Sequence, residues 1–360
     1  MEFEIDFLAV GKDSQSGDAI TFRFGNLYGE RKEQFVVVID GGFKESGEQL
    51  VNHIKKYYQT SDIDLVILTH PDADHASGLE VVLTELSIKK LWMHKPWNHT
   101  RDIADMFKDG RVTDQSVRDA LRRSLESARS LENLANAKKI PIEEPFIGLQ
   151  AANGHITVIG PTKDYYESLL PSFKGTPEPK EQYNLMQRAV IAVSDVIRKI
   201  AETFDIETLD DNGETTPENN SSAIVGVQYD GKLFLFTGDA GIPALTIAAD
   251  SLNAAGIDYS KISFMQVPHH GSKRNVGPKV LNRLIGPKLR ADTQIKAAYV
   301  SAAQDGAPKH PARKVTNAFR RRGAPVCATT GRSIRWQKDA PPRPDYEAID
   351  PLPFYAEVEE

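Results

Sequence analysis

The sequence of 360 residues contains one cysteine, Cys327, and no long apolar run. A single thiol cannot form an intrachain disulfide, which predicts a reducing compartment. No apolar stretch approaches the length that a membrane-spanning helix needs, so we expect no membrane partner. The N-terminal residues Met1 to Asp6 also lack the basic start and apolar core of a signal peptide. Together these absences predict a cytoplasmic protein.

The sequence also lacks a strong charge of either sign. The formal net charge is -6 and the calculated isoelectric point is about 5.9, so the overall charge gives no argument for nucleic-acid binding. Hydrophobic residues make up 40% and charged residues 26%, which is typical of a soluble globular protein. An anionic substrate would therefore need a local positive site, and a dinuclear metal centre would supply one.

Buried-type strands alternate with helical segments, and this order favours an α/β layered architecture. The main domain is expected over residues 1–336, with helical insertions near 100–140 and 163–220. Within the second insertion, residues 182–204 are predicted to form a helix. Residues 337–360 are rich in proline and acid, which predicts an exposed C-terminal tail. The basic triplet at 320–322 is expected on a solvated helix face.

Metal-capable side chains are concentrated in residues 64–80. The apolar run Leu65 to Leu68 predicts a buried strand, and His70, Asp72, Asp74 and His75 follow it within six positions. Imidazole and carboxylate groups are ligands of divalent ions such as zinc. Alternatively, Asp72 or Asp74 could simply cap the helix that follows. A cap explains only one of the four residues, so a metal site is the favoured interpretation.

Three other predicted strands also end in residues of this kind. They deliver Asp40, Asp239, and the pair His269 and His270. If these strand ends converge at one edge of a sandwich, their side chains can share a centre that keeps positions open for water and substrate.

The motifs resemble those of a known family. Thr69 to His75, followed by Gly78, resembles the signature loop of the metallo-β-lactamase superfamily, with Asp72 where its usual form has histidine. Together with 237–239 (Thr-Gly-Asp) and 268–272 (Pro-His-His-Gly-Ser), this variant is similar to the hydrolase-like domain of ComEC-type DNA-uptake proteins. The segments 220–222 and 310–311 also match that group.

The resemblance implies an αββα sandwich of two mixed sheets covered by helices. It also implies one or two ions of zinc or manganese, with the carboxylate at Asp72 shifting the preference toward manganese. His70 and Asp72 would hold the first ion, Asp239 would bridge, and the firmer second site would be formed by Asp74, His75 and His270. Which of the adjacent histidines 269 and 270 is the ligand stays open. The early aspartate segment of the family is only loosely represented, at residues 14–18, which leaves the role of the aspartate at position 18 in doubt.

Many relatives have one more histidine between the loop and the bridging aspartate. The candidates here are His94, His99 and His155, and for each an ordinary structural role is favoured.

The resemblance further implies metal-dependent hydrolysis, with Asp74 and His269 as catalytic residues. A phosphodiesterase or nuclease is favoured, acting on nucleic acid or a nucleotide. The expected substrate-binding residues are Ser272, Lys273, Arg274 and His310. The alternatives are hydrolysis of an ester, thioester or lactam, and a non-catalytic regulatory module on the same fold.

Overall fold

Two seven-stranded mixed sheets form the centre of the protein. The computed structural model describes residues 2–11, 17–183, 199–305 and 310–359. In sheet order, the first sheet consists of β17 (Ile334–Lys338), β1 (Glu2–Phe7), β2 (Ala19–Gly25), β3 (Gln34–Gly41), β5 (Leu65–Ile67), β7 (Leu91–Trp92) and β8 (Ile142–Glu143). The second consists of β16 (Val326–Ala328), β15 (Ala297–Val300), β14 (Ile262–Gln266), β13 (Lys232–Phe236), β12 (Ile224–Tyr229), β10 (Ile156–Gly160) and β9 (Gln150–Ala151).

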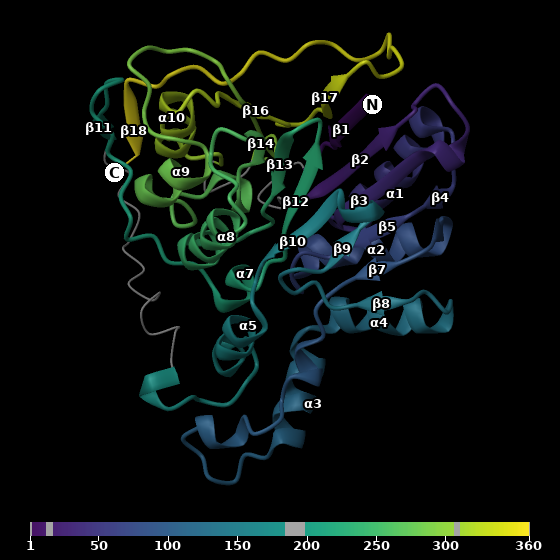
Figure 1. Ribbon diagram of the computed structural model, residues 1–360. Helices are drawn as coiled ribbons and strands as arrows, with labels where there is room; N and C mark the ends of the chain where they lie inside the picture. Colours follow the sequence, from purple (N-terminus) through teal and green to yellow (C-terminus); the bar gives the residue numbers. More distant parts are fainter. Residues whose placement is uncertain (1, 12–16, 184–198, 306–309, 360) are drawn as a thin grey trace.

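Helices cover the outer face of each sheet (Figure 1). The first sheet is covered by α1 (Lys44–His53), α2 (Ala73–Glu85) and α4 (Glu126–Ala137). The second is covered by α8 (Ile242–Ala254), α9 (Pro278–Leu284) and α10 (Arg313–Arg321). Helices α3 (Asp114–Ser124), α5 (Lys163–Leu169) and α7 (Pro217–Asn220) belong to the insertions. The predicted αββα sandwich is therefore confirmed.

The apolar pattern of β3 explains why both of its faces are covered. Val36 and Val38 pack in the cluster beneath α1 and α2, whereas Val37 and Ile39 pack in the cluster between the two sheets. Successive side chains of a strand point to opposite faces, so a continuous apolar run is expected where both faces are buried. The layered arrangement thus follows from this run of branched residues.

Two small ribbons complete the fold. β4 (Asp62–Ile63) pairs with β6 (Ser87–Ile88), and β11 (Lys199–Ala201) pairs with β18 (Glu357–Glu359) near the C-terminus. The helix expected over 182–204 falls mostly on residues 184–198, which lie outside the described residues, and residues 199–201 form a strand instead. Among the described residues, no helix combines the length and apolar character that crossing a bilayer requires.

The expectation of an exposed C-terminal tail is wrong at Arg343, although most of residues 337–359 are exposed or half-buried. The Arg343 guanidinium is buried and donates to Asp6 and Glu4, each at 2.7 Å. It also lies 4.4 Å from the centroid of the Tyr57 ring. Burial raises the pKa of Asp6, but His53 and Arg343 outweigh it and hold that pKa well below its ordinary value. The C-terminal segment is thus fastened to the first strand of the protein. The division into a domain of residues 1–336 and a tail of residues 337–360 stays a prediction.

The expectation of a solvated arginine triplet is also wrong for two of its members. Arg321 and Arg322 are fully buried, where they pair with Glu202 at 2.9 Å and Glu207 at 2.7 Å. The acidic partners come from the second insertion. These ion pairs therefore hold that segment against α10.

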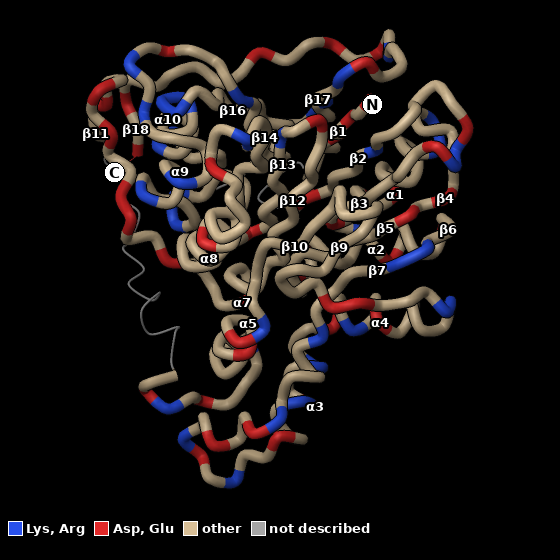
Figure 2. The backbone as a smooth tube through the Cα atoms, viewed as in Figure 1, with Lys and Arg blue, Asp and Glu red and all other residues tan. Residues whose placement is uncertain are grey.

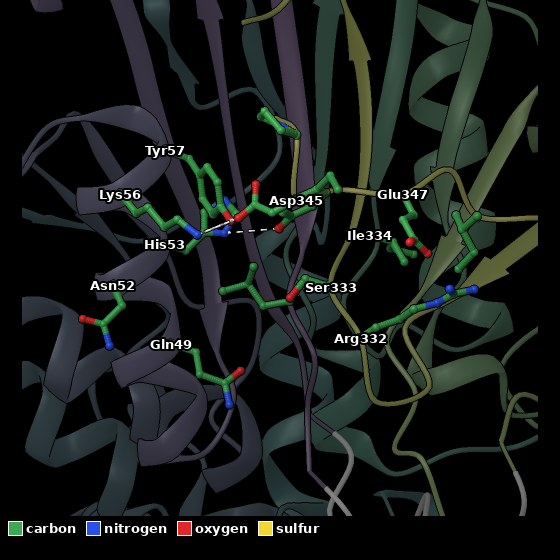
Figure 3. Close-up of a pocket in the computed structure, with 14 residues that line it drawn as sticks. Gln49, Asn52, His53, Lys56, Tyr57, Arg332, Ser333, Ile334, Asp345 and Glu347 are labelled. Carbon is green, nitrogen blue, oxygen red and sulfur yellow. Dashed lines mark hydrogen bonds and ion pairs between the residues drawn. The ribbon is translucent and has the colours of Figure 1, made fainter. Parts of the chain in front are cut away.

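A pocket of about 570 Å³ separates α1 from the C-terminal segment (Figure 3). Gln49, Asn52 and Lys56 line it from the side of α1 and of the helical turn that follows it. Lys56 donates to Asp345 at 2.6 Å, which links the two walls. The C-terminal segment thus forms one wall of the pocket.

Replacing Arg343 tests whether the C-terminal segment stabilises the fold. We expect Arg343→Ala to lower the free energy of unfolding by about 3–5 kcal/mol, because two buried carboxylates lose their partner. Denaturant unfolding followed by circular dichroism measures this effect. The control is Lys338→Ala, which removes an exposed pair with Asp230 and should change stability little. Equal unfolding midpoints for the two variants would contradict the expectation.

Candidate metal centre

The loop between β5 and α2 brings four polar side chains to one edge of the sandwich. Asp72 occupies the N-cap position of α2, but its side chain makes no capping hydrogen bond. The capping alternative therefore does not explain Asp72. Its carboxylate lies 3.7 Å from His70 Nε2 instead, and the side chain is partly exposed. The loop thus presents the carboxylate toward its neighbouring histidine.

Three histidines share one bonding pattern. His75 Nδ1 donates to Asp40 at 2.8 Å, and His270 Nδ1 donates to the Ser301 carbonyl at 3.1 Å. His70 Nδ1 lies 3.0 Å from the Thr69 hydroxyl, which itself donates to Asp40 at 2.6 Å. In all three rings Nε2 is buried without a hydrogen-bond partner among the described residues.

Unpartnered buried nitrogens of this kind need an explanation, because burying a polar atom without a partner is costly. Histidines that bind metals use one nitrogen for the ion and give the other N–H to a protein acceptor. Asp239 Oδ1 is likewise buried and unpartnered among the described atoms. The donor set therefore fits a divalent cation.

Distances between these atoms support that fit. His75 Nε2 lies 3.6 Å from Asp239 Oδ1 and 3.9 Å from Asp74 Oδ2, and His70 Nε2 lies 3.8 Å from Asp239 Oδ2. Two ligands of a tetrahedral zinc ion lie about 3.4 Å apart, given bonds of about 2.1 Å. The two oxygens of Asp239 thus face different histidines, which is the geometry a bridging carboxylate needs.

Only one of the two predicted ligand sets forms a close group of candidate ligand atoms, and Asp72 belongs to no such group among the described residues. Candidate ligand atoms lie within 4.8 Å of one another in four groups: Asp74, His75 and His270; Asp239, His269 and His270; Asp18, His75 and Asp239; and Asp40, His70 and His75. The first group is the set predicted for the second site. These placements show which side chains meet, and their assignment as ligands stays a prediction.

The electrostatics of the centre favour a cation. Burial lowers the pKa of His70 to about 4, so this imidazole is neutral near pH 7. Burial also lowers the pKa of His75, but Asp239 and Asp40 raise it well above its ordinary value. Burial raises the pKa of Asp239, but His269 and His75 hold it well below its ordinary value. An ionised carboxylate at this depth requires a nearby positive charge.

Three residues of the centre have a strained backbone. Asp40, His269 and His270 have φ angles of 53°, 48° and 55°, in the left-handed region that is unfavourable for residues with a side chain. A Cβ on Gly78 would lie 1.9 Å from the Gly41 carbonyl oxygen. Only glycine therefore allows α2 to approach the end of β3, and this approach brings Asp40 to His75.

The two adjacent histidines have different surroundings in the structure. His270 is buried and belongs to the group with Asp74 and His75. The side chain of His269 is 31% exposed, and its Nδ1 contacts Asp239 and lies 3.3 Å from Asn219. We therefore expect His270 to be the ligand and His269 to face the substrate.

The predicted substrate-binding residues lie around the His269–Gly271 turn. Ser272 is buried and accepts a hydrogen bond from the Arg274 backbone, whereas Lys273 and Arg274 are exposed. The ring of His310 lies 6.5 Å from that of His269. Burial lowers the pKa of His310 to about 4, so it is neutral near pH 7.

The sequence analysis gave no definite role to Asp18 or Asp40, although both lie at the candidate metal centre. Asp18 accepts a hydrogen bond from Gln266 at 2.7 Å and joins the group with His75 and Asp239. The Asp40 carboxylate accepts hydrogen bonds from His75 and Thr69 and so holds both residues in place. Its position at a strand end before two glycines was the only sequence signal for that role, and the loosely matching segment before Asp18 gave little indication of its place.

None of the candidates for an additional histidine is in these groups. His94 stacks on Tyr166 with ring centroids 4.4 Å apart, and His99 contacts Glu144 and Glu167. His155 packs against an aromatic ring of β2. Their ordinary structural contacts agree with the favoured interpretation.

Asp40→Asn tests whether the bond to His75 supports metal binding. We expect metal affinity to fall by about 10–100-fold, because an amide holds the imidazole less firmly than a carboxylate does. Competition with a chromogenic chelator measures the affinity. Asp102→Asn is the matched control, since Asp102 has the same left-handed backbone but an exposed side chain. Equal metal affinities in the two variants would show that Asp40 does not support metal binding.

Paired alanine variants test the assignment of the adjacent histidines. His270→Ala should lose roughly one metal equivalent, whereas His269→Ala should retain the wild-type metal content. Elemental analysis after dialysis measures the content. The reverse result would show that His269 is the ligand.

Comparison with known protein families identifies the family of the chain. The model of the metallo-beta-lactamase superfamily matches residues 21–284. A Thermotoga maritima protein assigned to the metallo-beta-lactamases has 11% identity and a TM-score of 0.33, over 66% of this chain and 79% of its own. The long form of RNase Z from yeast has 10% identity and a TM-score of 0.37, over 92% of this chain and 41% of its own. No curated protein matches. The family match covers most of the chain, and the protein belongs to the metallo-beta-lactamase superfamily.

Proposed function

We propose that the chain is a metal-dependent hydrolase of phosphodiester bonds, acting as a phosphodiesterase or a nuclease. The observation that carries this proposal is the approach of two unpartnered Nε2 atoms, those of His70 and His75, to the buried Asp239 carboxylate. His270, whose Nε2 is also unpartnered among the described residues, belongs to a close group with the same aspartate. A bound cation would explain such a donor set, because each buried atom has given up its hydrogen bonds to water. Superfamily membership supports the same chemistry.

The residues divide between two ion sites. In this proposal His70 and Asp72 would hold one ion, Asp74, His75 and His270 would hold the other, and Asp239 would serve both sites. Zinc and manganese both suit a set that mixes imidazole with carboxylate. One or two such ions would supply Lewis-acid chemistry, which lowers the pKa of water and polarises the phosphate.

The remaining steps fall to the side chains of the chain itself. The side chain of Asp74 is 31% exposed, so one of its oxygens can accept the proton of the attacking water. His269 is held at Nδ1 by Asp239 and Asn219, which leaves Nε2 to contact the phosphate or the leaving oxygen. The exposed cations Lys273 and Arg274 follow on the same turn, where positive charge suits an anionic substrate.

Metal reconstitution tests this function. The metal-depleted protein should be inactive, and loading with zinc or manganese should restore hydrolysis of bis(p-nitrophenyl) phosphate. Asp239→Asn should lower kcat/KM by at least about 100-fold, because both ion sites lose a ligand. Asp250→Asn is the control, since that exposed aspartate pairs with Arg283 on the neighbouring helix.

The same preparation should be assayed on other substrate classes. A metal-loaded protein that hydrolyses an aryl ester, a thioester or a chromogenic lactam but no phosphodiester would contradict the proposed substrate class. A folded protein that binds no metal would contradict the proposed enzyme and favour a regulatory module.

A further inference from the structure

A groove of about 970 Å³ opens directly beside the candidate metal centre. Asp72 and Asp74 form one end of it. The walls come from the two insertions, namely the junction of α3 and α4 at 124–127, the loop at 171–179, and the start of α7. A cavity of this size suits a small organic ligand. The insertions therefore shape the space in which a substrate would meet the reacting atoms.

Lys174 is the only lysine or arginine among the residues that line the groove. Its side chain is exposed, and its backbone N–H donates to the buried carboxylate of Glu218. Burial raises the pKa of Glu218, and the charge of Asp72 raises it further, whereas the charge of Lys174 opposes this shift. Lys174, Glu218 and Asp72 therefore interact at the end of the groove that holds the metal-capable carboxylates.

The rest of the lining is acidic, hydroxyl-bearing or apolar. Glu126 and Glu178 are exposed on the walls, and Glu178 pairs with Lys108 at 2.6 Å. Of the apolar lining residues, Ala73 is exposed and Pro177 is half-buried. Figure 2 shows both signs of charge over α3 and the segments around it, with no continuous basic stripe. A nucleic-acid strand carries one negative charge per nucleotide and needs such a stripe.

We propose that the groove receives the uncharged part of a small phosphodiester with a single negative charge, and that Lys174 contacts the phosphate of this substrate. This inference rests on the proposed function and narrows its substrate class. One phosphate can be matched by one lysine and the ions, while each further phosphate would face the carboxylates of Glu126, Glu178 and Glu218. The apolar wall supplies contact area for an uncharged organic group.

Substitutions at Lys174 test the contact with the phosphate. For metal-loaded Lys174→Ala, we expect KM for bis(p-nitrophenyl) phosphate to rise about tenfold or more, with little change in kcat, because a charge-assisted contact is lost. Lys174→Arg should restore most of the affinity. Hydrolysis of the uncharged p-nitrophenyl acetate should not respond to either change. Lys180→Ala, at the end of the same loop but outside the groove lining, is the control.

Comparing substrates of different length tests whether the groove excludes nucleic-acid strands, which carry several phosphates. The wild-type protein should have a higher kcat/KM for the small diester than for a single-stranded oligonucleotide, and Glu126→Lys should reduce this preference. A wild-type preference for the oligonucleotide, or identical behaviour of Lys174→Ala and Lys180→Ala, would overturn this inference alone. A metal-loaded protein that turns over no phosphodiester would overturn the proposed function and this inference with it.

Discussion

The centre depends on one buried carboxylate, that of Asp40. It accepts hydrogen bonds from the Thr69 backbone at 2.8 Å, from the Thr69 hydroxyl and from His75. These bonds join the end of β3 to the loop after β5, and they fix the orientation of the His75 ring. Asp40 has a left-handed backbone, so forming these hydrogen bonds requires local backbone strain. The strain is tolerated where it sets the geometry of the reacting groups.

The two sheets contribute different parts of the centre. The first sheet delivers the loop with His70 to His75, whereas the second delivers Asp239 after β13 and His270 after β14. The aromatic and branched residues between the sheets hold these two edges in register. The insertions then add the groove, so that the shared fold supports the chemistry and the insertions determine the space for the substrate.

Much of this arrangement could be predicted from the sequence. The order of buried strands and helices indicated a layered α/β fold, and the family resemblance implied the sandwich. The polar residues at the strand ends indicated the convergence of His70, His75 and Asp239, because strand ends of a layered fold meet at one edge. The distinction between His269 and His270 could not be predicted, since it depends on two successive left-handed residues in one turn.

Contacts between residues far apart in the sequence could not be predicted from local sequence patterns either. The C-terminal segment is rich in proline and acid, yet Arg343 docks against carboxylates of the first strand. The composition of a segment describes only residues that are close in the sequence, so it cannot predict a partner more than three hundred residues away. Burial of Arg321 has the same cause, since its partner Glu202 comes from an insertion.

The most direct test of the account is a crystal structure of the metal-loaded protein with anomalous diffraction at the metal edge. The account predicts at least one ion about 2.0–2.2 Å from His75 Nε2 and within bonding distance of Asp239. Anomalous density elsewhere on the protein, with His70, His75 and His270 still unpartnered at Nε2, would contradict it.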